Sequence, residues 1–245
     1  MGTDAMPSVD VSRHADRQGD WAAARAILAE GMVAHLGFIR DGWPVVLPFH
    51  YGIGDLGDGR GEQMIVHGST GGRAFLDAAR GEPGVPVSVC VSFNDALVLG
   101  RSQYATGARY RSVVAFGHAR LVPPESEQLA LDILMDHIIP GRRDEVRPPT
   151  RKEVAQTALL AIPLDHASVK VAGTATGEDS DDGEDRAIWA GILPLRTVAG
   201  APVASPETLN PDNVPKSVRS FLAAHDGNFP VAPQPRSRKL GGDLS

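Results

Sequence analysis

Segments that predict β-strands follow one another between residues 32 and 172 at the short spacing of hairpins. The clearest is 85–93, in which valine alternates with Pro86, Ser88, Cys90 and Ser92, the period-2 pattern of a strand. Helical patterns are few and short, and they do not alternate regularly with the strands as they would in a doubly wound α/β domain. The pattern therefore argues against a Rossmann fold and favours a mainly β protein, an antiparallel barrel with peripheral helices.

Turn and capping residues divide the chain into individual elements. Asp41-Gly42 and Asn94-Asp95 are typical of turns, Asp20 is a candidate helix N-cap, and Thr150 with Glu153 predicts a capping box. Strands are expected over residues 32–39, 44–53, 63–68, 85–93, 96–103, 110–122 and 158–172, the last interrupted at 163–166, and an apolar segment follows at 188–195. Helices are expected over 21–30, 72–80, 124–139, from Thr150 onward, and over 215–225.

Composition bounds the class of protein. The chain has 245 residues, 42% of them hydrophobic and 22% charged, with a formal net charge of -6, which are ordinary values for a soluble globular protein. This charge supplies no basic field for nucleic acid or an anionic membrane, and no run approaches the roughly 20 apolar residues of a membrane span. The N-terminus lacks the apolar core of a signal peptide. We therefore expect a cytoplasmic protein with no nucleic-acid or membrane partner.

Three regions are expected along the chain. Residues 1–19 predict a flexible N-terminal arm, 20–195 the barrel domain, and 196–245 a C-terminal extension with one short helix and then a disordered tail. Residues 173–186 carry six acidic side chains and predict a disordered loop. A barrel of six strands is filled by its own side chains. A ligand must then bind outside it, and a second subunit is the simplest cover for that ligand.

One stretch, residues 65–75, indicates a candidate anion-binding turn. An apolar strand ends in His67-Gly68-Ser69-Thr70, and Arg73 opens a helical pattern. Backbone N–H groups at a helix N-terminus, hydroxyl groups and a guanidinium all favour a phosphate. The same residues also suit an ordinary turn from strand to helix, which uses Gly and Ser for its backbone. Both interpretations stay open on the residues alone.

The single cysteine and the strand histidines have structural interpretations. Cys90 cannot form an intrachain disulfide and is expected to be a buried, unreactive thiol. His35 and His50 lie on expected strands, where a core position is the simpler interpretation. His67 ends a strand at the candidate turn, and it either positions that turn or touches a ligand.

Several motifs occur in a characteristic order. They are Asp41-Gly-Trp-Pro, His67-Gly-Ser-Thr, Tyr110-Arg-Ser-Val, Pro140-Gly-Arg-Arg and Trp189-Ala-Gly-Ile-Leu-Pro. This order resembles the flavin-nucleotide-binding proteins of the pyridoxamine 5'-phosphate oxidase-like superfamily, with the nitroimidazole-resistance reductases as named relatives, over about residues 20–195. The resemblance implies a six-stranded antiparallel FMN-binding split β-barrel. It also implies a homodimer with two flavins in its interface and redox chemistry on a small organic molecule.

The resemblance also implies which residues contact FMN. His67, Gly68, Ser69, Thr70 and Arg73 match the phosphate-binding region, Arg111 and Ser112 the neighbouring strand that holds the phosphate and ribityl chain, Val46, Leu47 and Pro48 the strand whose backbone lies against the isoalloxazine edge, and Trp189 the late segment that reaches the other subunit's flavin. The alternative for Arg111 is an ion pair with an acidic residue across the dimer. No metal site and no particular catalytic residue is expected.

The chain departs from its relatives at several places, one of which is the Arg/Lys spacing after His67-Gly68, compressed here at Arg73. Residues 105–109 lack the His and Asn that often precede Tyr-Arg-Ser-Val, and Trp189-Ala-Gly-Ile-Leu-Pro-Leu replaces the basic substrate-phosphate residues of pyridoxamine-phosphate oxidase itself. Two function classes follow. One is an FMN-dependent oxidoreductase that acts on nitro- or quinone-like compounds or a small amine, with NAD(P)H as reductant. The other is a non-catalytic flavin, haem or deazaflavin carrier, and a haem would take His35, His50 or His67 as axial ligand.

Overall fold

The computed structural model describes residues 6–9, 17–69, 79–172 and 185–225. Helix α1 (Trp21–Glu30) has the predicted bounds, and the Asp20 carboxylate accepts a hydrogen bond of 2.9 Å from the N–H of Ala23. Its buried face consists of Ala24, Ile27 and Leu28. The cap and the 3.6-residue periodicity therefore predicted this helix correctly.

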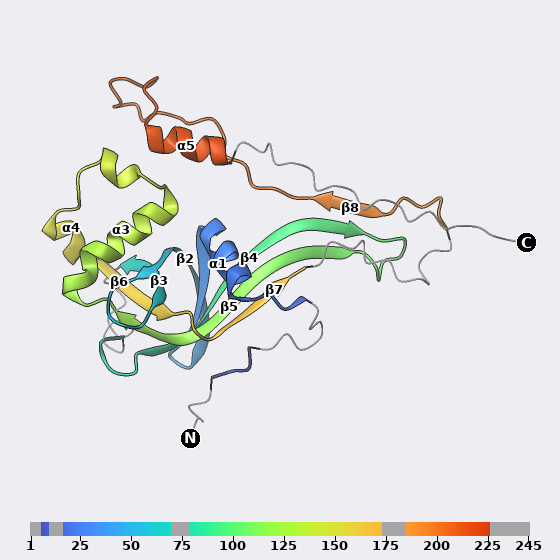
Figure 1. Ribbon diagram of the computed structural model, residues 1–245, viewed down its shortest axis with the longest axis horizontal. Coiled ribbons are helices and arrows are strands. Elements are labelled where there is room, and N and C mark those ends of the chain that lie inside the picture. Colours follow the sequence, from blue (N-terminus) through green and yellow to red (C-terminus); the bar gives the residue numbers. More distant parts are fainter. Residues whose placement is uncertain (1–5, 10–16, 70–78, 173–184, 226–245) are drawn as a thin grey trace, which may run out of the picture.

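Six antiparallel strands close into a ring, which confirms the predicted barrel (Figure 1). They are β1 (Val33–Arg40), β2 (Trp43–Asp55), β3 (Glu62–Ser69), β4 (Val85–Leu99), β5 (Gly107–Leu121) and β6 (Thr157–Pro163). Asp41 and Gly42 turn β1 into β2, both with positive φ. The ring closes because β5 pairs with β4 along most of its length and with β6 at Arg120 and Leu121.

One predicted turn is wrong. Asn94-Asp95 does not separate two strands, because β4 runs from Val85 to Leu99 with a β-bulge between Asn94 and Ala96. The register with β5 continues on both sides of the bulge. A bulge accommodates one extra residue without ending the ladder, so the turn-forming residues here bend a long strand. The hairpin turn lies beyond Leu99, before β5 begins at Gly107.

The barrel interior is filled by side chains. Among the largest fully buried residues are Tyr51, Leu36, Met64, Val66 and Val89, and α1 contributes Ile27 and Leu28 to the same cluster. The Tyr51 hydroxyl donates a hydrogen bond of 2.7 Å to the carbonyl of Leu28 and so ties the end of α1 to the barrel. A packed interior of this kind leaves the exterior as the place for a ligand.

Part of the exterior is covered by α3 (Glu127–Ile138), which follows a 3-10 turn, η2 (Pro124–Ser126). Leu134 and Ala130 of α3 pack with Ile65 of β3 and Leu159 of β6 in a second hydrophobic cluster. The approach of α3 to β2 is close enough to require glycine. A Cβ on Gly52 would lie 2.7 Å from the carbonyl oxygen of Ile133.

The remaining elements extend the sheet or flank it. They are η3 (Arg142–Glu145), α4 (Arg151–Ala155), β7 (Ala167–Val171), β8 (Gly191–Pro194) and α5 (Lys216–Ala224). The predicted capping box of Thr150 and Glu153 is present at α4. Strand β7 pairs with β5, and β8 pairs with the far end of β4, on the hairpin that projects from the barrel (Figure 1). None of the helices in the described ranges is long and apolar enough to cross a membrane.

The C-terminal extension returns from the projecting hairpin to the helical side of the barrel. Helix α5 is fixed there by Ser217, whose backbone N–H and hydroxyl both donate to the Glu145 carboxylate. The predicted helix over 215–225 is therefore correct. The expected helix over 72–80 lies outside the described residues except for Ala79 and Arg80, which are helical, and the loop at 173–184 and the tail at 226–245 lie outside them as well. The three-region division of the chain stays a prediction.

Candidate functional site

The exterior faces of four neighbouring strands form a continuous surface beyond the cover of α3. Residues directly opposite each other in paired strands share a face, so the register defines rows across the sheet. One row contains Pro48, His35, Cys90 and Val114, and it continues to Ser168 on the flanking strand β7. The next contains Val46, Gly37, Ser88 and Phe116. We call this surface, from β2 through β1 and β4 to β5, the open face.

Two histidines lie where the open face meets the part covered by α3. His50 is paired with Val33, and the register of β2 with β3, in which Tyr51 is opposite Val66, places His50 opposite His67 at the next position. Partial burial and then the neighbouring His50 lower the pKa of His67. This environment favours the uncharged form of the His67 imidazole.

The ring of His50 has a defined orientation. Its Nδ1 lies 3.0 Å from the backbone carbonyl oxygen of Met32. A carbonyl oxygen only accepts hydrogen bonds, so Nδ1 carries the hydrogen and donates it. Nε2 of the neutral ring is then the acceptor atom with a free lone pair. The site thus offers one imidazole nitrogen of fixed tautomer.

The structure corrects the interpretation of His35 and His50 as core residues. Both are exposed and lie on the exterior of the barrel, because each alternates with interior residues such as Leu36 and Tyr51. Cys90 was expected to be buried, but it is only half-buried, beside His35 on the open face. Burial raises the pKa of its thiol, while a hydrogen bond with Ser92 opposes the shift. An unreactive thiol remains consistent with this environment.

The predicted cofactor contacts divide between two faces of the barrel. Val46, Pro48, His67 and Ser112 are brought to the exterior. Leu47 and Gly68 point to the opposite face, since Leu47 is paired with the interior residue Leu36 and Gly68 has the same parity as Val66. Ser69 ends β3, and only its backbone is described. Thr70 and Arg73 lie outside the described residues, so their phosphate role stays a prediction.

Arg111 has carboxylate partners within its own chain. It donates to both oxygens of Asp95, at 2.8 and 2.9 Å, and to both oxygens of Glu30, at 2.9 and 3.0 Å. Hydrogen bonds to Asp95 and then Glu30 raise the pKa of Arg111. The guanidinium also lies over Phe93, 4.9 Å from the ring centroid. This arrangement joins α1, β4 and β5, and it uses the donors that a phosphate would need.

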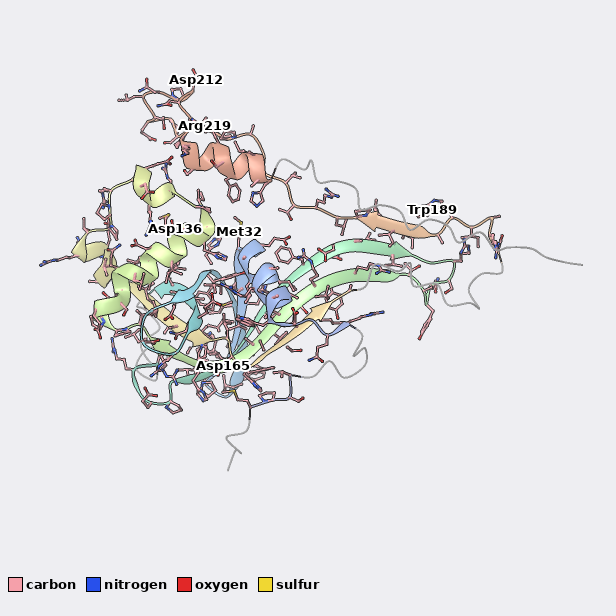
Figure 2. The ribbon with its side chains drawn as sticks, in the orientation of Figure 1. Met32, Asp136, Asp165, Trp189, Asp212 and Arg219 are labelled. Carbon is pink, nitrogen blue, oxygen red and sulfur yellow. The ribbon has the colours of Figure 1, made fainter. Side chains whose placement is uncertain are left out.

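Trp189 lies apart from the other predicted contacts. It precedes β8 on the projecting hairpin, is 67% exposed, and is labelled at that end of the molecule in Figure 2. A role at a flavin would therefore require a second subunit, as the resemblance implies, and it stays a prediction.

A shallow cavity of about 440 Å³ opens at one end of the open face. Its lining includes Phe38, Val46, Ser88, Phe116 and His118, together with Met6 and Pro7 of the N-terminal segment. Nε2 of His166 donates a hydrogen bond of 2.7 Å to the carbonyl of Pro7 and holds that segment against the barrel. Within the described ranges no group of three or more His, Cys, Asp or Glu residues is arranged to hold a metal ion directly.

Sequence reasoning missed the most informative feature of the site, which is that His35, His50 and His67 all lie on the barrel exterior. The alternation of each with apolar neighbours was a usable signal, because Val33-Ala-His-Leu and Phe49-His-Tyr have a period of two. That signal shows that a histidine and its neighbours point in opposite directions. It does not show which direction is the interior.

Comparison with known proteins identifies the family. The sequence pattern of the pyridoxamine 5'-phosphate oxidase family matches residues 20–171. The FAD- and haem-binding protein from Mycobacterium smegmatis is 33% identical, with a TM-score of 0.73 over 83% of this chain and 96% of its own. The flavocytochrome Anf3 from Azotobacter vinelandii is 28% identical, with a TM-score of 0.74 over 87% of this chain and 98% of its own. No curated protein matches the sequence significantly.

Both structural matches extend past the part that defines the family. Residues 1–171 make up about seven tenths of the 245-residue chain, whereas the matches cover 83% and 87% of it. Each match must therefore include part of the segment that carries β8 and α5. From the family pattern over residues 20–171 and the relative at 33% identity, this chain belongs to the pyridoxamine 5'-phosphate oxidase family of split β-barrel proteins.

Proposed function

We propose that the protein is a flavin-binding oxidoreductase that holds its cofactor against the open face. The observation that carries the proposal is the match, over more than four fifths of the chain, to two proteins named for bound flavin, one as FAD- and haem-binding and one as a flavocytochrome. The family resemblance implies FMN, whereas the M. smegmatis protein is named for FAD. The proposed cofactor is therefore a flavin, and the choice between FMN and FAD is made by experiment.

The first half of β2 suits recognition of a flavin ring. Residues Tyr51 to Asp55 pair with β3, but Trp43 to His50 pair only with β1, and no other described strand pairs with their second edge. That edge presents backbone groups, and a few well-placed backbone N–H and C=O groups commonly orient a ligand. Val46 and Pro48 stand on the open face beside it. This supports the predicted position of the isoalloxazine edge.

A second copy of the chain is the proposed cover for the flavin. Exposed apolar side chains occur on β1 and the start of β2, where Ile39 is 67% and Val46 63% exposed on the open face and Trp43 is 75% exposed at the end of the strand on the other face. Contiguous exposed apolar groups mark interaction surfaces. A homodimer would bury this surface together with the cofactor and bring elements such as Trp189 to the partner's site. Light scattering tests the assembly, and a flavin-loaded monomer would contradict it.

Flavins supply the electron-transfer chemistry themselves, so the chain needs to bind, orient and shield. On the open face the groups available for this are imidazoles, hydroxyls and backbone amides, as is expected of an orienting site. The proposed reaction is reduction or oxidation of a small organic molecule, with NAD(P)H as electron donor. A carrier without turnover is the alternative, because the names of the two relatives describe cofactors and no substrate.

The first experiment is the absorption spectrum of the protein purified without added cofactor. We expect the two visible bands of a flavin, and chromatography of the denatured supernatant then identifies FMN or FAD. A colourless protein that takes up neither nucleotide would overturn the proposal. Steady-state NAD(P)H oxidation with and without a quinone or nitro acceptor separates an enzyme from a carrier.

Haem is a second candidate cofactor, also named for the M. smegmatis relative. The residues present fit it. An iron ligand is available in an exposed imidazole, and the adjoining surface includes Val33, which is 40% exposed. When bound, haem supplies one-electron transfer, and the chain's contribution is the axial ligand and an apolar surface.

A further inference from the structure

Three of the exterior histidines, His35, His50 and His67, differ in how firmly their rings are held. His50 donates from Nδ1 to the Met32 carbonyl at 3.0 Å. Within the described residues, neither His35 nor His67 has a hydrogen bond of this kind to a backbone carbonyl. Metal-bound histidines almost always donate their other ring N–H to a carbonyl, carboxylate or water, which fixes the tautomer and makes the ligating nitrogen more basic. Of these three histidines, His50 is the one that already has that arrangement.

The surroundings of His50 also suit a flat apolar macrocycle. Its cross-strand partner Val33 is 40% exposed, and Pro48 lies two residues away on the same face. In the other direction along β2, toward its C-terminal end, α3 covers the strand from Gly52 onward. His50 is therefore the first exterior position of β2 beyond this cover, with its imidazole next to apolar surface that α3 leaves open.

His50 and His67 cannot both ligate one haem. The two axial ligands of a haem iron approach from opposite sides of the macrocycle, whereas His50 and His67 project from the same sheet face, each one residue beyond the Tyr51–Val66 pair that ends the β2–β3 ladder. Side chains opposite each other in paired strands have Cβ atoms only about 5 Å apart, and these two lie one step past such a pair. At most one of the pair can therefore reach the iron, and the other is left beside the macrocycle.

We infer that Nε2 of His50 is the protein's axial ligand to a haem iron bound on the open face. The inference rests on the proposed function, because it assigns a ligand to the second cofactor considered there. It places His67 beside the haem. His35 lies two residues along β1 from Val33, the cross-strand partner of His50, and is itself opposite Pro48.

The test is hemin titration of the purified full-length protein and of three matched variants, His50→Gly, His67→Gly and His35→Gly. Haem affinity, the position of the Soret band and the electron paramagnetic resonance spectrum are the readouts. Flavin content and the unfolding midpoint of each variant serve as controls for folding. Removing an outer-shell partner of a metal commonly costs about 10–100-fold in affinity, so loss of the ligand itself in His50→Gly should cost at least as much.

Imidazole rescue makes the result specific to ligation. Added imidazole should restore the wild-type Soret band and resonance spectrum in His50→Gly and leave those of the other two variants unchanged. A wild-type spectrum in His50→Gly, or loss of the histidine signature in His67→Gly or His35→Gly instead, would overturn the assignment. Wild-type protein that binds flavin but not hemin would overturn it while leaving the flavin proposal standing. Failure to bind either cofactor would remove both.

Discussion

Under α3 the exterior residues of the barrel are buried as its interior residues are, whereas on the open face the exterior positions are exposed or half-buried. The covered part has Gly52 and Gly54 where α3 approaches and a fully buried Ile65. The open face has His35 and Val46 in equivalent exterior positions. Both parts belong to the same barrel, meet on β2 and have the same alternation. The difference shows that cover by a distant helix decides whether an exterior residue stabilises the fold or is available to a ligand.

The largest expected effect comes from removing apolar volume under α3. Ile65 is fully buried in the cluster with Leu134 and Leu159, so Ile65→Ala should lower the free energy of unfolding by about 2–5 kcal/mol. Val46→Ala on the open face, at 63% exposure, should change it by less than about 0.5 kcal/mol and weaken flavin retention or dimerisation instead. Urea unfolding and flavin titration of both variants measure this. Equal losses of stability would mean that the open face is as covered as the other part.

A pair of glycines tests the same contrast at the level of one methyl group. A Cβ on Gly52 would meet the backbone oxygen of Ile133 at 2.7 Å, and a Cβ on Gly37 would meet the Ser88 hydroxyl oxygen at the same distance. The backbone of a packed helix cannot move away from a new methyl group as easily as a serine hydroxyl can rotate away from one. Gly52→Ala should therefore cost about 1–3 kcal/mol of unfolding free energy, and Gly37→Ala clearly less, as measured by thermal or urea unfolding. A larger loss for Gly37→Ala would contradict the comparison.

The Arg111 cluster should contribute to stability to a smaller extent. Hydrogen bonds to charged groups contribute about 1.5–3 kcal/mol, but Glu30 is 51% and Asp95 36% exposed, so solvent screening reduces this. We expect Arg111→Ala to lower the free energy of unfolding by about 1–2 kcal/mol, with Arg147→Ala, an exposed pair with Glu153, as the control with the smaller loss. Flavin affinity should be measured in the same variant. A large loss of flavin with unchanged stability would restore the phosphate role that the sequence predicts.

The smallest effect concerns pH and a histidine in α3. His137 donates from Nε2 to the Gly31 carbonyl at 2.7 Å and packs against Tyr51. Burial lowers the pKa of His137, although the bond to Gly31 opposes the shift. The unfolded chain therefore binds the proton more readily than the folded one, and stability should fall as pH decreases through about 6.5. Unfolding free energies between pH 5.5 and 7.5 should depend less on pH in His137→Gln, and an unchanged slope would contradict this.

Local patterns predicted most elements of the barrel. The Asp20 cap, the Asp41-Gly42 turn, the alternation of β4 and the Thr150–Glu153 box all depend on residues close in sequence, and the structure contains each of them. Asn94-Asp95 is the exception. Its local preference for a turn was overridden by the long register between β4 and β5 on both sides of the bulge, because many ladder hydrogen bonds outweigh one local preference.

The candidate site was less predictable for the same reason. The family motifs led to His67, Ser112 and the first half of β2, and these do reach the barrel exterior. Arg111 satisfies the same motif, yet its guanidinium faces Asp95 and Glu30. Glu30 is at the end of α1, far from Arg111 in sequence, and no spacing rule connects them. The packing of α1 against the barrel makes that partnership.

By itself the sequence determined most of the strands, the Asp41-Gly42 turn and the fact that His50 and Tyr51 point in opposite directions, because a strand alternates with a period of two whatever surrounds it. The tertiary structure decided which direction is outward. That depends on the closure of β5 onto both β4 and β6, and on the packing of α3 over Gly52. Both are contacts between residues distant in the chain. They bury Tyr51, cover Ile65 and leave His50 at the surface, and so place an imidazole where a cofactor can reach it.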